Sequence, residues 1–197
     1  MSHRVTELQC IMPIDNIPSI MQNGILSHEQ ASKLDHNDIS LSDVQDKRNL
    51  KTVPSGLRLH QYANLYFCAR NPMMYKRRNH RDNLCVLRIS KEVLKLQNVV
   101  LADQNAASKY VSFYKSPQGL HSINFDMVFA DNWKHPEDQI AEWRHSSAKC
   151  AEVLVPHCVE VEYIDGAYVA NEKAKTNLEN TGFNKPITIN AHMFFMS

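Results

Sequence analysis

Glycine is scarce in this sequence, with 5 glycines in 197 residues, and none of them belongs to a phosphate-cradling loop. The Rossmann fingerprint and the P-loop both need glycines at fixed spacing, because backbone N–H groups must approach the phosphates closely. A nucleotide site in this chain must therefore use another architecture.

An excess of charge of either sign is also absent. The chain has 22 Lys and Arg against 21 Asp and Glu, and its net charge is +1. Such a balance gives no general attraction to nucleic acid or to an anionic membrane, so a nucleic-acid site would have to be a local patch. The 5 cysteines are odd in number, widely spaced and without the close pairing of a zinc site, so we expect them reduced and mostly buried.

Long apolar runs are missing as well. None approaches the roughly 18 residues of a membrane span, and the first residues lack the charged-then-apolar layout of a signal peptide. Repeats and Gly/Ser linkers are absent too, and the length suits one hydrophobic core. We expect a cytoplasmic protein that forms a single domain over residues 1–197 and has no membrane partner.

The hydrophobic pattern mixes short strands with short helices and has no regular strand-helix alternation, which is typical of an α+β domain around a bent sheet. The expected helices are residues 15–24, 105–114 and 171–180. The expected strands are residues 63–69, 84–89, 153–155, 159–163 and 186–195. A basic turn, residues 76–81, separates the first two strands.

Pattern alone assigns no chemistry to the charged residues. Glu152 is most simply a solvated carboxylate at a strand end, and Arg48 an ordinary surface residue. The turn from Lys76 to Arg81 carries four fixed positive charges and could equally be a plain turn or a phosphate contact. Tyr62, Tyr66, Tyr75 and Trp133 could stack bases, although aromatic residues at strand positions are more often core. The histidines show no ligand spacing, so no metal site is expected.

Longer sequence segments change this interpretation. They are IDNIPSI at residues 14–20, NGILSH at 23–28, VQDKR at 44–48, KTVP at 51–54, LHQYANLYF at 59–67, RNPMMY at 70–75 and KCAEVLV at 149–155. In this order, and over nearly the whole chain, they resemble the DarT family of DNA ADP-ribosyltransferase toxins. The resemblance implies an ADP-ribosyltransferase-like fold with a split, bent central sheet and short flanking helices, NAD as co-substrate and no metal.

The resemblance also assigns roles. Glu152 would hold the nicotinamide-side ribose and stabilise positive charge at the anomeric carbon as nicotinamide leaves. Arg48 is the second catalytic residue that the resemblance implies: it would bind the NAD phosphates with its planar guanidinium, or assist proton removal from the attacking base. A charged arginine is a poor base, so electrostatic positioning is favoured. Further NAD contacts are implied at Cys10, Ile11, Met12, Asn16, Ser19, Ser27 and Tyr66. The DNA contacts expected from the basic run and from the matching substrate region are Lys76, Arg77, Arg78, Trp133, Arg144 and Lys149.

One departure concerns the first strand, where many DarT members carry histidines and this chain has Cys10-Ile11-Met12-Pro13. Backbone contacts would then replace side-chain contacts to NAD. Pro13 and the word Asn71-Pro72-Met73-Met74-Tyr75 resemble the guanine-modifying branch more than the thymidine-modifying one.

The family pairs its toxins with DarG, an antitoxin whose macrodomain removes the modification, so single-stranded DNA and such an antitoxin are the implied partners. Two alternatives stay open at this point. The chain could be a nucleic-acid-binding protein of the same fold with weak chemistry. It could also be a transferase that acts on RNA or protein.

Overall fold

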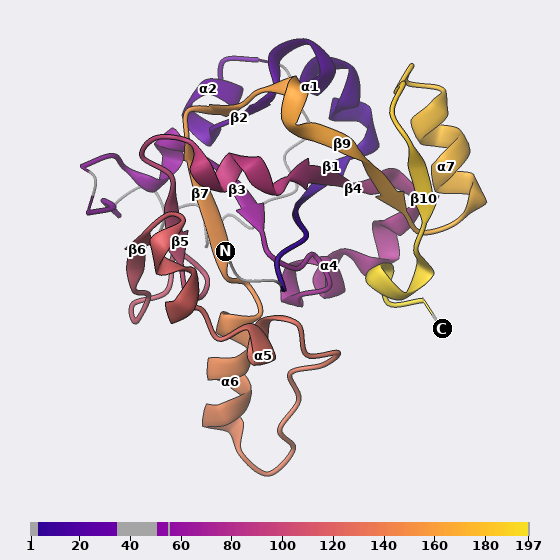
Figure 1. Cartoon of the computed structure of the whole chain (residues 1–197). Coiled ribbons are helices and arrows are strands. Elements are labelled where there is room, and N and C mark those ends of the chain that lie inside the picture. The colour runs from indigo at the N-terminus through magenta and orange to yellow at the C-terminus, as the bar shows by residue number, and fades with distance from the viewer. Residues whose placement is uncertain (1–3, 35–50, 55, 197) are drawn as a thin grey trace.

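A computed structural model describes residues 4–34, 51–54 and 56–196 of the chain. Its main sheet has the strand order β10-β9-β4-β1-β3-β7-β5-β6 (Figure 1). All neighbouring strands are antiparallel except β9 and β10, which are parallel. The strands are β1 (Glu7–Pro13), β3 (Tyr62–Tyr66), β4 (Leu84–Ser90), β5 (Val100–Ala102), β6 (Phe113–Lys115), β7 (Glu152–Pro156), β9 (Ile164–Val169) and β10 (Ile187–Ile189). A small second sheet pairs β2 (Ile25–Leu26) with β8 (Cys158–Val159).

The main sheet is split between β1 and β3. These strands share only the Gln9–Tyr66 register pair, whereas β1 matches β4 from Glu7 to Pro13 and β3 matches β7 from Tyr62 to Tyr66. Beyond that pair, β1 and β3 diverge toward Pro13 and Tyr62. The expected α+β fold with a split central sheet and short helices is confirmed.

Side chains alternate between the two faces of the sheet, because successive residues of a strand point in opposite directions. One face carries the largest core, which includes Leu8, Leu65, Leu87 and Val153. The opposite face carries Tyr66 and Glu152, which are register partners, together with two smaller clusters built around Ile11 and Leu154. We call this opposite face the Glu152 face.

Short helices surround the sheet. They are α1 (Ile17–Asn23), α2 (His28–Ala31), α4 (Pro72–Arg77), α5 (Phe125–Val128), α6 (Gln139–Ala148) and α7 (Glu172–Glu179), with 3-10 helices at Ile14–Asn16, Leu59–Gln61, Arg78–Asn83, Lys91–Lys95, Gln118–Ser122, Val161–Tyr163 and Ala191–Phe194. The predicted α7 is confirmed: the Asn171 side chain accepts from the Ala174 N–H at its start, and Gly182 follows its end with a φ of 81°. The expected helix after Asp15 is also present.

Several expected elements are wrong. Residues 105–112 form a loop, because Asp103 accepts from the Ser112 N–H and Asn105 from the Ala107 N–H, and residues 113 and 114 belong to β6. The basic run belongs to α4 and the 3-10 helix that follows it. The strand expected over residues 159–163 ends after Val159, and β9 was missed. The last expected strand is limited to β10.

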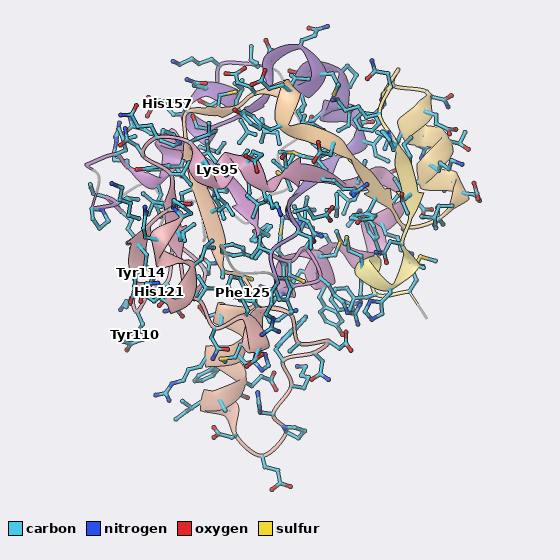
Figure 2. All side chains as sticks on the ribbon, in the orientation of Figure 1. Lys95, Tyr110, Tyr114, His121, Phe125 and His157 are labelled. Carbon is cyan, nitrogen blue, oxygen red and sulfur yellow. The ribbon has the colours of Figure 1, made fainter. Side chains whose placement is uncertain are left out.

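A lobe that contains α5 and α6 projects from the body of the molecule, as the lower part of Figure 1 shows. Phe125 lies where the lobe meets the body, and its ring packs edge-on against Phe67 with centroids 5.4 Å apart (Figure 2). None of the described helices is long and apolar enough to cross a membrane. The lobe leads directly into β7, so it is joined by a short stretch of chain to Glu152, the first residue of that strand.

Candidate functional site

Glu152 is the first residue of β7 and is buried, with 1% of its surface exposed. The solvated position expected from pattern alone is therefore wrong. The reason is the strand's place in the sheet: Tyr66 of β3 lies beside Glu152 on one side and Ala102 of β5 on the other. One carboxylate oxygen, Oε1, accepts a 3.0 Å hydrogen bond from the backbone N–H of Ala106, in the loop that follows β5. This bond fixes the carboxylate at the closed end of the split.

Gln9 extends the same cross-strand row on β1, opposite Tyr66. Its side-chain oxygen accepts from the Ala69 N–H at 2.7 Å, and its amide nitrogen donates to Glu7 Oε1 at 2.9 Å. Gln9 therefore connects the two halves of the sheet where they meet. Sequence reasoning missed this residue, because only the register reveals that it lies next to Tyr66.

Asn64 adds an unpaired polar atom to the Glu152 face. It lies on β3 opposite Leu154, two residues from Tyr66, and so shares the face of Tyr66 and Glu152. Its side-chain oxygen is buried and has no hydrogen-bond partner among the described residues. An unpaired buried oxygen costs free energy unless a ligand supplies a donor, so Asn64 marks a place for a polar ligand in the split. In the sequence, Asn64 stood out only as a member of the LHQYANLYF segment at residues 59–67.

The expected NAD contacts on β1 are divided between the two faces. Ile11 lies on the Glu152 face, two residues from Gln9. Cys10 and Met12 point to the largest core, and burial raises the pKa of the Cys10 thiol to about 12. Contact between NAD and Cys10 or Met12 would therefore be through the backbone, which agrees with the absence of histidine from this strand.

The remaining expected NAD contacts lie at the other end of β7. Ser27 is buried, its N–H donates to the His157 carbonyl, and its side chain caps α2 by accepting from the Gln30 N–H. His157 follows Glu152 by five residues, which is roughly 16 Å along an extended chain. Figure 2 labels His157 near α2, far from the lobe. Asn16 and Ser19 belong to the helical segment after β1, which lies at this same end in Figure 1.

Arg48, expected as the second catalytic residue, lies outside the described residues. Its position relative to Glu152 is therefore still a prediction.

The structure gathers most of the expected DNA contacts around Tyr75. This residue is 40% exposed, so the core interpretation of its ring is wrong. The Arg78 guanidinium lies 4.0 Å from the Tyr75 ring centre, and the ring of Trp133 meets Tyr75 edge-on at 5.9 Å. Lys76 is exposed on the same helix and Arg77 is half-buried. Trp133 itself is buried, at 8% exposure, and braces Tyr75 rather than facing solvent.

The structure contradicts the expected contact between Lys149 and DNA. It is 1% exposed, and its ammonium donates to the carbonyls of Val128 at 2.8 Å and Ala130 at 2.7 Å. Burial lowers the pKa of this ammonium. Lys149 therefore fastens the start of the lobe to its end, three residues before Glu152. Arg144, in contrast, is exposed on α6.

Within the described part of the chain, no three His, Cys, Asp or Glu side chains come together as metal ligands would. The cysteines are free, and Cys10, Cys85 and Cys150 are buried while Cys68 and Cys158 are half-buried.

With this geometry in place, comparison with known proteins gives consistent results. A family model described as "ssDNA thymidine ADP-ribosyltransferase, DarT" matches residues 10–195. A Thermosipho africanus DNA ADP-ribosyl transferase-DNA ADP-ribosyl glycohydrolase fusion protein is 30% identical over 94% of this chain and 48% of its own length. A DNA ADP-ribosyl transferase from Thermus aquaticus is 25% identical over 86% of this chain and 78% of its own.

Solved structures share the fold. Thermosipho africanus DarTG in complex with ADP-ribose superposes with a TM-score of 0.82 at 27% identity, over 96% of this chain and 51% of that one. Thermus sp. 2.9 DarT in complex with ADP-ribosylated ssDNA also gives 0.82, at 22% identity over 97% of both chains. This chain thus spans about half of the Thermosipho protein. Because the family model covers residues 10–195, the chain belongs to the DarT family.

Proposed function

We propose that this chain, acting as one domain, transfers ADP-ribose from NAD to a base of single-stranded DNA and releases nicotinamide. In this reaction the bond between the nicotinamide nitrogen and the anomeric carbon breaks, a bond from that carbon to the base forms, and the base gives a proton to solvent. The observation that carries the proposal is the buried Glu152 carboxylate, held by the Ala106 N–H at the closed end of the split.

Glu152 would act through its negative charge. As nicotinamide leaves, positive charge develops on the ribose, and a fixed carboxylate in a site with little water stabilises that charge strongly. One carboxylate oxygen accepts from the Ala106 N–H, and a carboxylate can accept several hydrogen bonds at once because it offers about four acceptor directions. Glu152 can therefore keep this bond and still accept from a ribose hydroxyl.

Two further residues support NAD as the ligand of the split. The Asn64 oxygen on the Glu152 face has no hydrogen-bond partner among the described residues, so it suits a hydroxyl or amide donor, and NAD carries both. Arg48 would bind the NAD phosphates, as the resemblance of the VQDKR segment at residues 44–48 to the DarT family implies. No metal is part of the proposal.

The DNA strand would approach along α4. Lys76 and Arg78 supply positive charge beside the exposed ring of Tyr75, and cations beside an aromatic ring are the usual means of holding single strands. Guanine is the proposed acceptor base, because Pro13 and the Asn71-Pro72-Met73-Met74-Tyr75 segment resemble the guanine-modifying branch of the family. The description of the family model names thymidine.

The test is to incubate the chain with labelled NAD and single-stranded oligonucleotides that each lack one base, beside a Glu152→Ala control. Mass spectrometry then locates the label. Label on guanine alone, absent in the control, supports the proposed acceptor, and label on thymidine moves the chain to the other branch. If NAD binds but no oligonucleotide is labelled, the DNA proposal is wrong, and RNA and protein mixtures become the next acceptors.

A partner follows from the Thermosipho relative, in which the transferase is fused to a DNA ADP-ribosyl glycohydrolase. We propose that a separate or fused glycohydrolase with a macrodomain, of the DarG type, removes the modification made by this chain. A glycohydrolase of this class should release ADP-ribose from DNA that the chain has labelled. Label that resists such an enzyme would contradict this pairing.

A further inference from the structure

The N–H that holds Glu152 belongs to Ala106, which lies in a tight turn between Asn105 and Ser108. The Ser108 N–H donates to the Asn105 carbonyl at 2.9 Å and closes the turn. At the start of the turn, the Asn105 N–H donates to the Ser147 carbonyl at 3.0 Å. The direction of the Ala106 N–H, and with it the position of the Glu152 carboxylate, therefore depends on the groups that hold this turn at its two ends.

Lys51 holds the end of the turn. Its ammonium donates to the Ser108 carbonyl. The same ammonium lies 5.6 Å from the ring centre of Phe113, the first residue of β6. A hydrogen bond from a charged donor is stronger than one between neutral groups, and the ring face adds a second attraction for the charge. The Lys51 side chain thus links the turn to the neighbouring strand.

The backbone of Lys51 is itself anchored to the Glu152 face of the sheet. The Leu59 N–H donates to the Lys51 carbonyl at 2.9 Å. Val53 and Leu59 are each 1% exposed, and they pack in one cluster with Ala106. Lys51 is half-buried beside this cluster. Its ammonium therefore reaches the turn from a segment whose position is fixed by burial.

The strand register gives a second connection between Lys51 and Glu152. Glu152 of β7 pairs with Ala102 of β5, and Ala102 pairs with Phe113 of β6. These three strands are neighbours in the main sheet (Figure 1). Residues paired in such a row point to the same face, so the ring beside the Lys51 ammonium lies on the Glu152 face. Lys51 is thus connected to the carboxylate both through the turn and across the sheet.

Lys109 provides a comparison within the same loop. It follows Ser108 directly and is exposed. Within the part of the chain that the structure describes, its ammonium has no ion pair or hydrogen bond. Two lysines therefore lie close to the turn, and the structure connects Lys51 to it by a side-chain bond.

We propose that Lys51 is a positioning residue for the transfer reaction: it fixes the turn so that the Ala106 N–H holds the Glu152 carboxylate ready for the charge that develops on the ribose. This inference rests on the proposed function, and in it Lys51 touches neither NAD nor DNA. Electrostatic stabilisation requires an anion whose position is set before the charge develops. A loose turn would leave the carboxylate misplaced for part of the time, which lowers the rate of bond breaking and leaves NAD binding unchanged.

The first test measures nicotinamide release at saturating single-stranded DNA over a range of NAD concentrations. Lys51→Met should lower kcat by about tenfold, because small displacements of a group at a reacting centre have effects of this size or larger. Its KM for NAD should stay within about twofold, since only the transition state loses stabilisation. A raised KM with an unchanged kcat would overturn the inference, because Lys51 would then act on NAD.

Two further variants control for charge and for folding. Lys51→Arg keeps a charged donor for the Ser108 carbonyl and should restore kcat to within about threefold of the wild type. Lys109→Met removes a charge from the same loop and should match the wild type. Equal losses in Lys51→Met and Lys109→Met would contradict the proposal. If Lys51→Met does not fold, Lys51→Gln takes its place, and it should lower kcat by about threefold or more because its donor is neutral.

A double-mutant cycle tests whether Lys51 acts through Glu152. In the Glu152→Gln background the charge is gone, so Lys51→Met should change the residual rate by less than about twofold. A purely structural effect of Lys51 would lower the rate equally in both backgrounds. Such an equal loss would overturn the inference.

Hydrogen exchange separates this inference from the proposed function, because it needs no activity. The exchange rate of the Ala106 N–H, followed by NMR, should rise about tenfold in Lys51→Met and stay unchanged in Lys109→Met. If the wild type transfers nothing to DNA and this rise is observed, the proposed function fails and the support of Glu152 by Lys51 stands. An unchanged exchange rate in Lys51→Met would overturn the inference even if transfer is observed.

Discussion

Glu152 Oε1 accepts a hydrogen bond of 3.0 Å from the backbone N–H of Ala106, so the loop after β5 holds the carboxylate at the start of β7. The loop in turn is closed by the bond from the Ser112 N–H to Asp103 and is fastened to the lobe by the bond from the Asn105 N–H to Ser147. The carboxylate therefore has a fixed orientation before a substrate arrives. Preorganisation of this kind is what electrostatic catalysis requires.

Replacement of Asn64 by leucine should affect NAD binding without harming the fold. The Asn64 oxygen is buried and unpaired among the described residues, so its removal relieves a cost and the free energy of unfolding should stay the same or rise. The Kd for NAD, measured by calorimetry, should increase about tenfold through loss of one hydrogen bond to the ligand. An unchanged Kd would show that Asn64 does not contact NAD.

Lys149→Met should loosen the lobe. The variant leaves the carbonyls of Val128 and Ala130 without their donor, and the free energy of unfolding should fall by about 1–3 kcal/mol. DNA transfer should fall further than NAD binding, because Lys149 acts on the lobe rather than on the split. Lys175→Met is the matched control. Equal losses of NAD affinity and DNA transfer would contradict this role.

The surface around Tyr75 predicts a salt effect. In Lys76→Ala/Arg78→Ala, two cations near this exposed ring are removed, so single-stranded DNA should bind more weakly at low salt. The slope of log K against log salt should become shallower by about 1.4, since each phosphate contact on a single strand contributes about 0.7. Fluorescence anisotropy at several salt concentrations measures the slope. If it does not change, DNA takes another path.

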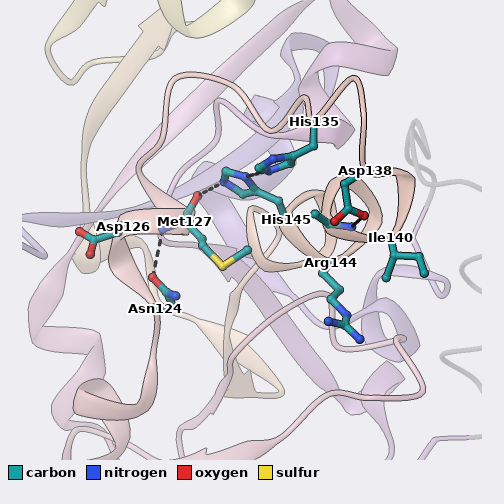
Figure 3. Close-up of a pocket in the computed structure, with 9 residues that line it drawn as sticks. Asn124, Asp126, Met127, His135, Asp138, Ile140, Arg144 and His145 are labelled. Carbon is teal, nitrogen blue, oxygen red and sulfur yellow. Dashed lines mark hydrogen bonds between the residues drawn. The ribbon is translucent and has the colours of Figure 1, made fainter.

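His145 predicts a pH dependence of stability. Its Nε2 lies 3.1 Å from the Met127 carbonyl and its Nδ1 2.9 Å from His135 Nε2, so a neutral ring that donates through Nε2 can accept from His135 (Figure 3). Burial lowers the pKa of His145, and the charges of His135 and Lys149 lower it further. As the pH falls below 6.5, His145 therefore binds a proton in the unfolded chain before it does so in the folded chain.

The stability that His145 contributes should therefore be complete above pH 6.5 and be lost as the pH falls through its lowered pKa. Urea unfolding at pH 7.5 and at pH 5.5, for the wild type and His145→Gln, isolates this effect from other titrations. The wild type should lose more stability than the variant on acidification. Equal losses would show that His145 does not contribute to the pH dependence of stability.

Some of the structure could be predicted from the sequence because the signals are local. Asn171 and Gly182 bound α7 by capping and by a positive φ, and both are readable from neighbouring residues. The loop at residues 103–112 could not be predicted, because its Asp103–Ser112 closure competes with a helix of reasonable composition. That this loop supports Glu152 could also not be predicted, because it depends on the strand order, which places β5 beside β7.

The site shows the same limit. Glu152 was identified from the family resemblance, but its burial depends on β3 and β5, which are distant in sequence. Lys149 has the composition of a surface residue and is buried because two carbonyls of the lobe converge on its ammonium. Gln9 and Asn64 have no sequence signal, since only the register places them beside Tyr66 and Leu154.

The measurement that tests the central claim most directly compares the wild type with Glu152→Gln for nicotinamide release in the presence of single-stranded DNA. Glutamine keeps the volume and an oxygen for the Ala106 N–H, so its free energy of unfolding should match the wild type within about 1 kcal/mol. It lacks the charge, so transfer should fall by about 100-fold or more, and in the wild type each nicotinamide released should match one ADP-ribose on DNA. A folded Glu152→Gln variant that retains transfer within about tenfold of the wild type would contradict the account.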